Sequence, residues 1–249
     1  MTGETAIIIP SAGRSKCVVT AISGAVLFVP EAEADDYRRH NPSTTIETHG
    51  TDDFNNLSEK RQSIYDRWGN VFMVDDDIAF VSRLNGIGNN RHDHLTPDEV
   101  NDLIQRTAAT ARAAGCYLYG FHSTPNLLHF HAQKPISLTN YINACAFGIH
   151  PSPLLYFSPR TVAAESHWIN LLNAYVHRKS WSDTRYCFAQ EPNSTFFKAG
   201  GQTARRTLES EMRDTIFLRR MFGQAVKTRR TSGNGSKSHP YQRTIRNPL

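Results

Sequence analysis

The chain has 249 residues, of which 39% are hydrophobic, and a formal net charge of +5. This length is enough for one large domain with a buried core. No stretch approaches an apolar run that could span a membrane, and residues 1–10 lack the basic start of a signal peptide. We therefore expect a cytoplasmic protein with no membrane partner. The four cysteines show no zinc-site spacing, which favours reduced thiols.

Charge is distributed unevenly along the chain. Every acidic residue lies at or before Asp214, so the last 35 residues carry +8, whereas the first 214 carry 20 basic and 23 acidic residues. A basic end favours a polyanionic partner, either a nucleic acid or a nucleotide pyrophosphate. A solvated tail without a partner is the alternative. With the Gly/Ser-rich stretch at 231–236, the pattern predicts a globular domain over 1–226 and a basic, partly flexible tail over 227–249.

Strand and helix patterns alternate in the first third of the chain. The predicted strands are 6–10, 25–29, 44–48 and 71–74, and the predicted helices are 31–39 and 57–68, the latter capped by Ser58. This alternation predicts an α/β fold with a mostly parallel central sheet and flanking helices. In such sheets ligands bind at the carboxyl ends of the strands.

The rest of the chain continues the mixed pattern. Thr96 and Pro97 are typical of a helix start, and that helix is expected to end at Gly115. Further strands are expected at 116–121, 127–132, 154–158 and 186–190, helices at 164–177 and 207–222, and either a helix or a strand at 138–145. The apolar face expected for the last helix comprises Leu208, Met212, Ile216, Leu218 and Phe222.

Three consecutive carboxylates, Asp75, Asp76 and Asp77, follow the apolar run at 71–74. Side chains alternate along an extended chain, so Asp75 and Asp77 are expected to face one way and Asp76 the other. Like charges are costly to stack unless a cation or amide groups compensate them, and two carboxylates on one face suit Mg2+ or Mn2+. A polar turn after a strand is the alternative interpretation.

Two sets of basic residues are expected near this run. Arg14 ends a small-residue loop after the first strand, where a guanidinium can bind phosphate with two hydrogen bonds. Lys60 and Arg61 lie on the helix before the aspartates and are placed to reach a nucleotide in the same crevice. The alternatives are a surface arginine and a solvated helix face.

A glycine-containing loop occupies residues 198–207. Its paired glycines, Gly200 and Gly201, allow backbone amides to approach a ligand closely. The next residue, Gln202, offers a side-chain amide, and Arg205 and Arg206 add positive charge. An ordinary loop before a helix is the alternative.

Two single residues complete the set of candidates. Asp183 stands just before a predicted strand, and one positioned carboxylate can act as a general base on a hydroxyl. A helix cap or an ion-pair partner is the alternative role for Asp183. His239 lies in the basic tail, and a tail that folds back would bring it to the aspartate run as a third metal ligand. His129 and His131 share a predicted strand face and are interpreted as structural.

Three of these features together resemble the GT-A fold of sugar-nucleotide-dependent glycosyltransferases. The features are the strand ending at Pro10 followed by Arg14, the pair Lys60-Arg61, and the run Val71 to Asp77. A second set more specifically resembles the TET-associated glycosyltransferases, encoded largely by bacteriophages: Asp183, Arg185-Tyr186, Gly200-Gly201, Arg205-Arg206-Thr207 and Glu209. The resemblance covers about residues 5–225 and implies a GT-A-like, Rossmann-like sheet.

This resemblance implies a UDP-sugar donor and a Mn2+ or Mg2+ cofactor. It also implies an acceptor hydroxyl on 5-hydroxymethylcytosine, or a related hydroxymethyl-pyrimidine, in DNA. A phage-encoded chain would act in the cytoplasm of the host cell. Asp183 corresponds to the catalytic base, which in the family usually follows a Glu, where this chain has Ser182. The implied donor-binding residues are Pro10, Ala12, Arg14, Lys60, Arg61, Asp75, Asp76, Gly200 and Gly201; the acceptor-binding residues are Gln202, Arg205, Arg206, Arg229, Arg230, Lys237 and Arg243; the metal ligands are Asp75, Asp77 and His239.

Two other classes of function remain open on the sequence. A sugar-1-phosphate nucleotidyltransferase also uses a nucleotide, a metal and carboxylates, but it normally opens with a Gly-rich basic loop longer than residues 11–14. A non-catalytic nucleic-acid-binding protein would explain the basic tail but not the aspartate run. The sugar, the stereochemical outcome and the oligomeric state are not determined by the sequence.

Overall fold

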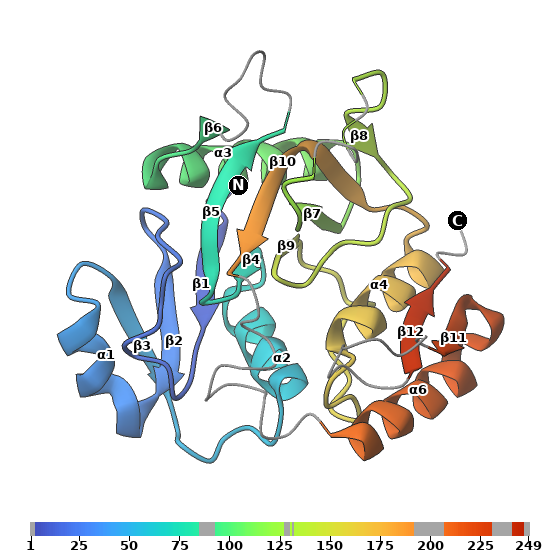
Figure 1. The fold of residues 1–249 in the computed structure, drawn as a ribbon, viewed down its shortest axis with the longest axis horizontal. Coiled ribbons are helices and arrows are strands. Elements are labelled where there is room, and N and C mark those ends of the chain that lie inside the picture. The colour runs from blue at the N-terminus through green and yellow to red at the C-terminus, as the bar shows by residue number, and fades with distance from the viewer. Residues whose placement is uncertain are drawn as a thin grey trace.

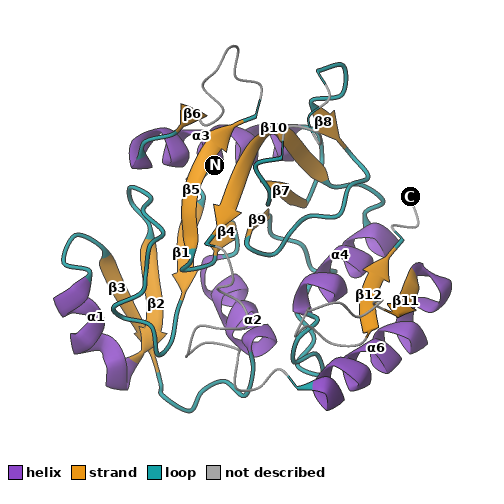
Figure 2. Cartoon of the chain, in the orientation of Figure 1, coloured by secondary structure: helices purple, strands orange, loops and turns teal. Residues whose placement is uncertain are grey.

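The computed structural model describes residues 3–84, 93–126, 130, 132–191, 207–230 and 241–246, and of residues 229, 230, 241 and 242 it describes the backbone alone. The chain forms a mixed α/β fold in which helices flank a large central sheet (Figures 1 and 2). The expected fold class is therefore confirmed.

The central sheet takes its strands from residues 6–190, with helices between them along the chain. These strands are β1 (Ala6–Pro10), β2 (Val26–Pro30), β3 (Thr45–His49), β4 (Val71–Val74), β5 (Ile78–Arg83), β6 (Asp93–His94), β7 (Leu118–His122), β8 (Ile136–Ser137), β9 (Ala146–Ile149) and β10 (Trp181–Gln190). The helices are α1 (Ala34–His40), α2 (Leu57–Trp68), α3 (Pro97–Ala113), α4 (Glu165–Val176) and α6 (Leu208–Phe222), with 3-10 turns at Glu31–Glu33 and Gly223–Ala225. A separate pair consists of β11 (Val226–Arg230) and β12 (Tyr241–Ile245).

Most strands of the central sheet point the same way. The order is β3-β2-β1-β4-β9-β7-β10-β5-β6, with β8 beside β10. Strands β1 to β4 pair in parallel, as do β7 and β10. Strand β9 is antiparallel to both β4 and β7, so β7 and β10 share the direction of β4, and β5 runs against β10. The carboxyl ends of β1, β4 and β10 consequently open on the same side of the sheet.

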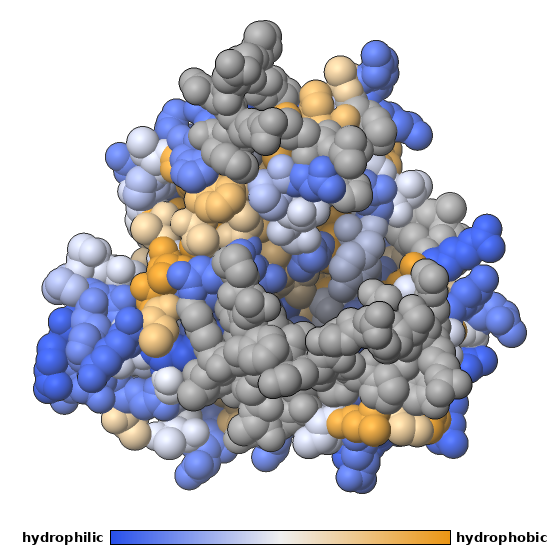
Figure 3. Space-filling view, in the orientation of Figure 1, coloured by the Kyte–Doolittle hydropathy of each residue, from blue (hydrophilic) through white to orange (hydrophobic). Residues whose placement is uncertain are grey.

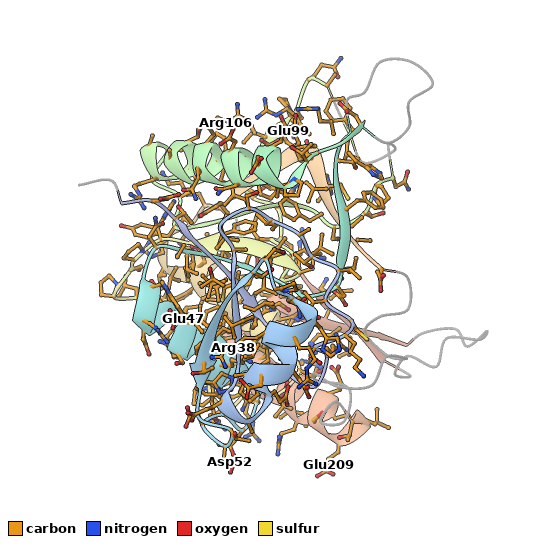
Figure 4. The ribbon with its side chains drawn as sticks, turned by 90° about the vertical axis from the view of Figure 1, so that its left-hand side faces the viewer. Arg38, Glu47, Asp52, Glu99, Arg106 and Glu209 are labelled. Carbon is orange, nitrogen blue, oxygen red and sulfur yellow. The ribbon has the colours of Figure 1, made fainter. Side chains whose placement is uncertain are left out.

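Alternating side chains of the strands form a core on each face of the sheet. Ile7 and Ile9 of β1 pack in one cluster with the buried face of α3, whereas Ile8 packs in another with residues of α2 and α4. This is the period of two expected for an extended chain that is buried on both faces. Figure 4 shows α3 along one edge of this view, with the charged side chains of Glu99 and Arg106 on its outer side.

Local sequence signals define the ends of α3 and α2. Thr96 forms a complete capping box with Glu99 at the start of α3, and Gly115 follows its end with φ +68°. In α2 the cap is Asn56, whose side chain accepts a hydrogen bond from the Glu59 backbone, and not Ser58 as predicted. Ser58 is buried instead and donates to the Thr161 carbonyl at 2.8 Å.

Helix α6 forms where predicted, and only part of its predicted apolar face is buried. Leu208, Met212 and Ile216 are 44%, 49% and 51% exposed, respectively. Figure 3 shows apolar colour along the lower edge of the molecule, where α6 lies. Phe217 and Leu218 are buried, and they pack with residues of α4. Leu218 and Phe222 of the predicted face thus pack inward, whereas the other three residues do not.

The end of the chain is more ordered than the sequence indicated. Residues at both ends of the predicted tail pair as the antiparallel strands β11 and β12, and the predicted boundary at 226/227 falls inside β11. Val226 is buried, and Ile245 packs with it against the cluster shared by α4 and α6. Residues 231–240 lie outside the described part of the chain.

Two predicted elements differ from the structure, and a third lies mostly outside its described residues. Residues 138–145 form neither a helix nor a strand, and residues 154–158 are a loop in which Leu155 and Phe157 are nevertheless buried. Of the strand predicted at 127–132, only residues 130 and 132 are described, and neither is in a strand. The four cysteines are free, as expected, and no helix among the described residues is long and apolar enough to cross a membrane.

Candidate functional site

The aspartate run lies between β4 and β5, at the carboxyl end of β4. The four residues of β4 are fully buried, so the strand fixes where the run begins. The backbone reinforces this position: the Asp75 N–H donates to the Cys145 carbonyl, and Thr20 donates to the Asp75 carbonyl at 2.6 Å. The three carboxylates are thus held by β4 and by loops from two other parts of the chain.

Asp75 and Asp77 converge on one side chain. The amide nitrogen Nε2 of Gln190 lies 3.3 Å from Oδ2 of Asp75 and 3.1 Å from Oδ1 of Asp77. Asp76 and Asp77 form the turn between β4 and β5, which is the alternative interpretation of the run, and Asp75 and Asp77 are related by their shared contact with Gln190. The Asp77 side chain is only 6% exposed and that of Asp75 is 30% exposed, so the pair lies at the edge of the core.

Asp76 faces the loop after β1. Its carboxylate accepts hydrogen bonds from Ser11 Oγ and, at 3.1 Å, from Nη1 of Arg14. The same Arg14 nitrogen is 4.0 Å from Asp77. Burial raises the pKa of Asp76, whereas the hydrogen bond from Ser11 and the charge of Arg14 lower it. Arg14 therefore neutralises the run, as well as lying on the loop where phosphate binding was predicted.

Pro10 and Ala12 lie on the same loop, on either side of Ser11. Pro10 is the last residue of β1 and stands beside Phe28 of β2. The Ser11 backbone N–H donates to the Phe28 carbonyl, and the Ser11 hydroxyl lies 2.7 Å from the Tyr37 hydroxyl. The predicted donor-binding loop is consequently fixed beside the aspartate run by β2 and α1.

Arg61 connects the run to α4. Its side chain is 1% exposed, and Nη2 lies 3.0 Å from Oδ1 of Asp75 and 3.1 Å from the Ala144 carbonyl. Nη1 lies 3.6 Å from Oε1 of Glu165, the first residue of α4. Burial raises the pKa of Asp75, Arg61 lowers it and Asp77 raises it again. One buried guanidinium thus holds carboxylates from two distant segments.

Lys60, the neighbour of Arg61, is also buried. Its Nζ donates to the Ser11 carbonyl at 2.8 Å and lies 5.6 Å from the centre of the Phe28 ring. Burial lowers the pKa of Lys60 to about 7, against the opposing effect of Glu33 and Asp76. Arg14 and Arg61 therefore contact the aspartate run and Lys60 contacts the loop after β1, whereas the predicted donor-binding role of these residues stays a prediction.

The structure does not bring Asp183 to this site. Asp183 lies near the start of β10, beside Phe121 of β7, whereas Gln190, which contacts the aspartate run, lies at the end of the strand. Its carboxylate is buried and receives two hydrogen bonds from the Arg185 side chain, at 3.0 Å and 2.7 Å. These contacts match the ion-pair alternative, and the catalytic role of Asp183 stays a prediction.

Arg243 also has a different role from the one predicted. Its side chain is 6% exposed and pairs with Glu211 of α6 at 2.6 Å. It also donates to the Ala163 carbonyl and to Thr215. A guanidinium bound inside the fold in this way is not available to DNA phosphates, so we correct the assignment of Arg243 as a DNA contact.

Several predicted residues lie outside the described part of the chain. They are Gly200, Gly201, Gln202, Arg205, Arg206, Lys237 and His239, and the side chains of Arg229 and Arg230 are likewise not described. Among the described residues, no group of three His, Cys, Asp or Glu side chains is arranged to hold a metal ion.

Two site residues were missed by the sequence analysis. Gln190 ends a predicted strand, and Glu165 lies at the start of a predicted helix, so both positions carried the signal that ligand sites gather at strand and helix ends. The sequence did not indicate that β10 pairs with β5 or that α4 contacts Arg61. Each of these contacts joins residues about a hundred positions apart.

Comparison with known proteins leaves the family open. No family model and no curated protein matches the chain. Among solved structures, S. aureus TarS 1–349, a glycosyltransferase, is similar with a TM-score of 0.45 and 12% identity over 75% of this chain and 60% of that chain. CMP:2-keto-3-deoxy-manno-octonic acid synthetase complexed with CTP is similar with a TM-score of 0.41 and 9% identity over 87% of this chain and 99% of that chain. At such low scores and identities, neither likeness carries a conclusion about activity.

Proposed function

We propose that this protein transfers a sugar from a nucleotide-sugar donor to a hydroxyl group, with the help of a divalent cation at the aspartate run. One observation carries the proposal: Asp75 and Asp77 converge on a single point at the carboxyl end of β4, with Asp76 fixed to the loop after β1. Oxygen donors that converge in this way fit Mg2+ or Mn2+. When bound, such an ion would stabilise negative charge on a leaving diphosphate.

The surrounding cations suit a donor that carries a diphosphate. Arg14 and Lys60 meet at the loop after β1, and Arg61 stands behind Asp75. Positive charge that is fixed before the reaction stabilises charge that develops during it, since no reorganisation is needed. We assign the diphosphate to the side of the run that faces Arg14.

Glu165 replaces Asp183 as our candidate for the general base. It shares Arg61 with Asp75, so it belongs to the same cluster, whereas Asp183 does not. In the proposed transfer, the bond from the anomeric carbon to the diphosphate oxygen breaks and the nucleoside diphosphate leaves with the electron pair. The acceptor oxygen bonds to that carbon, and its proton passes to the Glu165 carboxylate.

The finer assignment is a UDP-sugar donor and 5-hydroxymethylcytosine, or a related base, in DNA. Its support is the charge asymmetry of the chain, in which the last 35 residues carry +8, together with the resemblance to the TET-associated glycosyltransferases. A base in duplex DNA must leave the stack before its hydroxymethyl group can reach a cleft, so base flipping is expected. The exposed Lys227 on β11 is one candidate for a backbone contact.

The test is to incubate the protein with UDP-sugars, Mn2+ and DNA with or without 5-hydroxymethylcytosine, and to weigh the released nucleosides by mass spectrometry. We expect one nucleoside to gain the mass of a sugar, with release of UDP. Pyrophosphate released from a nucleoside triphosphate and a sugar phosphate would instead identify a nucleotidyltransferase. DNA binding without turnover of any nucleotide would identify a non-catalytic binding protein.

Asp77→Asn supplies the matching test of the site. Removing one negative charge from a hard-cation site should abolish most of the transfer, and EDTA should do the same reversibly. Asp66→Asn is the control, because Asp66 lies on α2 with its carboxylate bound to Gln62 on the protein surface. Full transfer in EDTA would show that no cation is needed.

A further inference from the structure

Gln190 is brought to the aspartate run by strand pairing. Strand β10 runs antiparallel to β5, and its last residue, Gln190, pairs with Ile78, the first residue of β5 and the one that follows Asp77. The next backbone N–H, that of Glu191, donates to the Asp77 carbonyl at 2.9 Å. Gln190 is therefore held at this place by the sheet itself, on the side where Asp75 and Asp77 converge.

The Gln190 amide stands where the two carboxylates meet. Its Nε2 is 3.3 Å from Asp75 and 3.1 Å from Asp77, both within hydrogen-bonding reach. Without a cation, an amide N–H2 group is a suitable partner for two carboxylates because it offers two donors. The opposite end of the same planar group is a carbonyl oxygen, and a half-turn of the terminal bond exchanges the two.

A cation at Asp75 and Asp77 would depend on a ligand of another type, because the described residues include no group of three His, Cys, Asp or Glu side chains that could hold a metal. Hard cations also accept the carbonyl oxygens of Asn and Gln. Arg14 and Arg61 already contact carboxylates of the run, so a neutral ligand adds an oxygen without adding to the negative charge.

We propose that Gln190 is a ligand of the divalent cation, supplying its carboxamide oxygen beside the carboxylates of Asp75 and Asp77. In the cation-free protein its nitrogen holds these two carboxylates together, which keeps the site assembled. This inference rests on the cation that the proposed function assigns to the aspartate run.

Mn2+ binding to the full chain tests the proposal without any measurement of turnover. Free Mn2+ is followed by electron paramagnetic resonance, and water bound to protein-held Mn2+ by proton relaxation. Gln190→Ala should weaken Mn2+ binding on the order of tenfold and add about one bound water, because water replaces the lost ligand. Gln190→Glu, which keeps an oxygen at the same reach, should bind Mn2+ at least as tightly as the unaltered chain.

Gln133→Ala is the matched control, since Gln133 is exposed and lies on a loop near β8. Thermal unfolding without metal shows whether each variant folds, and Gln190→Glu supports or overturns the proposal even where Gln190→Ala does not fold. Unchanged Mn2+ affinity and water number in Gln190→Ala, or lost binding in Gln190→Glu, would overturn the role of Gln190 alone. An unaltered chain that does not bind Mn2+ would overturn the cation of the proposed function as well.

Discussion

Buried charge is concentrated around three adjacent carboxylates. Lys60 and Arg61 are 7% and 1% exposed, and the Arg14 side chain is 10% exposed. Charged groups are rarely buried to this extent, because removing them from water costs several kcal/mol each unless partners compensate. Such an arrangement is costly for stability, and it is the kind of site at which function retains the charge.

Lys60→Met tests this cost directly. The pKa of Lys60 is about 7 in the folded protein and 10.5 ordinarily, so between these values the unfolded chain binds more protons and stability rises with pH. Below pH 7 the whole cost of the buried charge is present. We expect Lys60→Met to be more stable at pH 6.5 by about 1 kcal/mol or more, or roughly 2–4 °C in Tm, with the gain lost by about pH 10.

Thermal unfolding across this pH range provides the measurement. Lys134→Met, at an exposed position, is the control and should leave the pH dependence unchanged. A Lys60→Met variant that is less stable at every pH would show that the hydrogen bond from Lys60 to the Ser11 carbonyl outweighs the cost of burying the charge.

The two ends of strand β10 make different contacts. At its start, Asp183 is buried and bound to Arg185, whose side chain is 44% exposed. At its end, Gln190 contacts the aspartate run. The bulge between these positions shifts the pairing of β10 with β7, and only the first part of β10 lies beside β8. The strand thus separates a structural ion pair from the candidate site.

We consequently expect Asp183→Ala to lower stability and Glu165→Gln to lower the transfer rate. Losing the buried Asp183 carboxylate removes three hydrogen bonds from Arg185, which should cost about 1–3 kcal/mol of stability and leave the transfer rate near that of the unaltered enzyme. Glu165→Gln should retain the fold and lower the transfer rate by about 100-fold or more. Denaturant unfolding and initial rates give the two readouts. A strong loss of rate in a normally stable Asp183→Ala would restore Asp183 as the base.

At the scale of the whole molecule, the basic end of the chain has two parts. Its hairpin packs on α6 and α4, where Arg243 binds Glu211 and the Ala163 carbonyl. Asp214 of α6 is completely buried and accepts from the backbone N–H groups of Val162 and Ala163. These contacts hold the segment that leads directly into Glu165. The C-terminal hairpin is therefore coupled to the candidate site through the fold.

Single substitutions in the hairpin should separate stability from DNA binding. Arg243→Met leaves Glu211 buried without its partner and should cost about 3–5 kcal/mol, with little change in the salt dependence of DNA binding. Lys227→Gln removes an exposed charge and should flatten the slope of log affinity against log salt by roughly 0.9, with unchanged stability. Unfolding curves and salt titrations of DNA binding measure both effects. The opposite pattern would make Arg243 the DNA contact after all.

Features that depend on neighbouring residues were determined by the sequence. The apolar runs gave β1 and β4, and Thr96 gave the start of α3. The pairing of Asp183 with Arg185 is of the same local kind, because residues two apart on a strand share a face. These outcomes follow from periodicity and capping, which act within a few residues.

The tertiary structure alone decided which distant groups meet. Gln190 reaches Asp75 across 115 positions, and Arg61 binds both Asp75 and Glu165. The buried face of α6 was likewise set by α4, which packs on Phe217 and Leu218 and leaves Leu208, Met212 and Ile216 exposed. A repeat of apolar residues shows only that a helix has an apolar side. Which side is buried depends on the surface it meets, and that surface is built from remote parts of the chain.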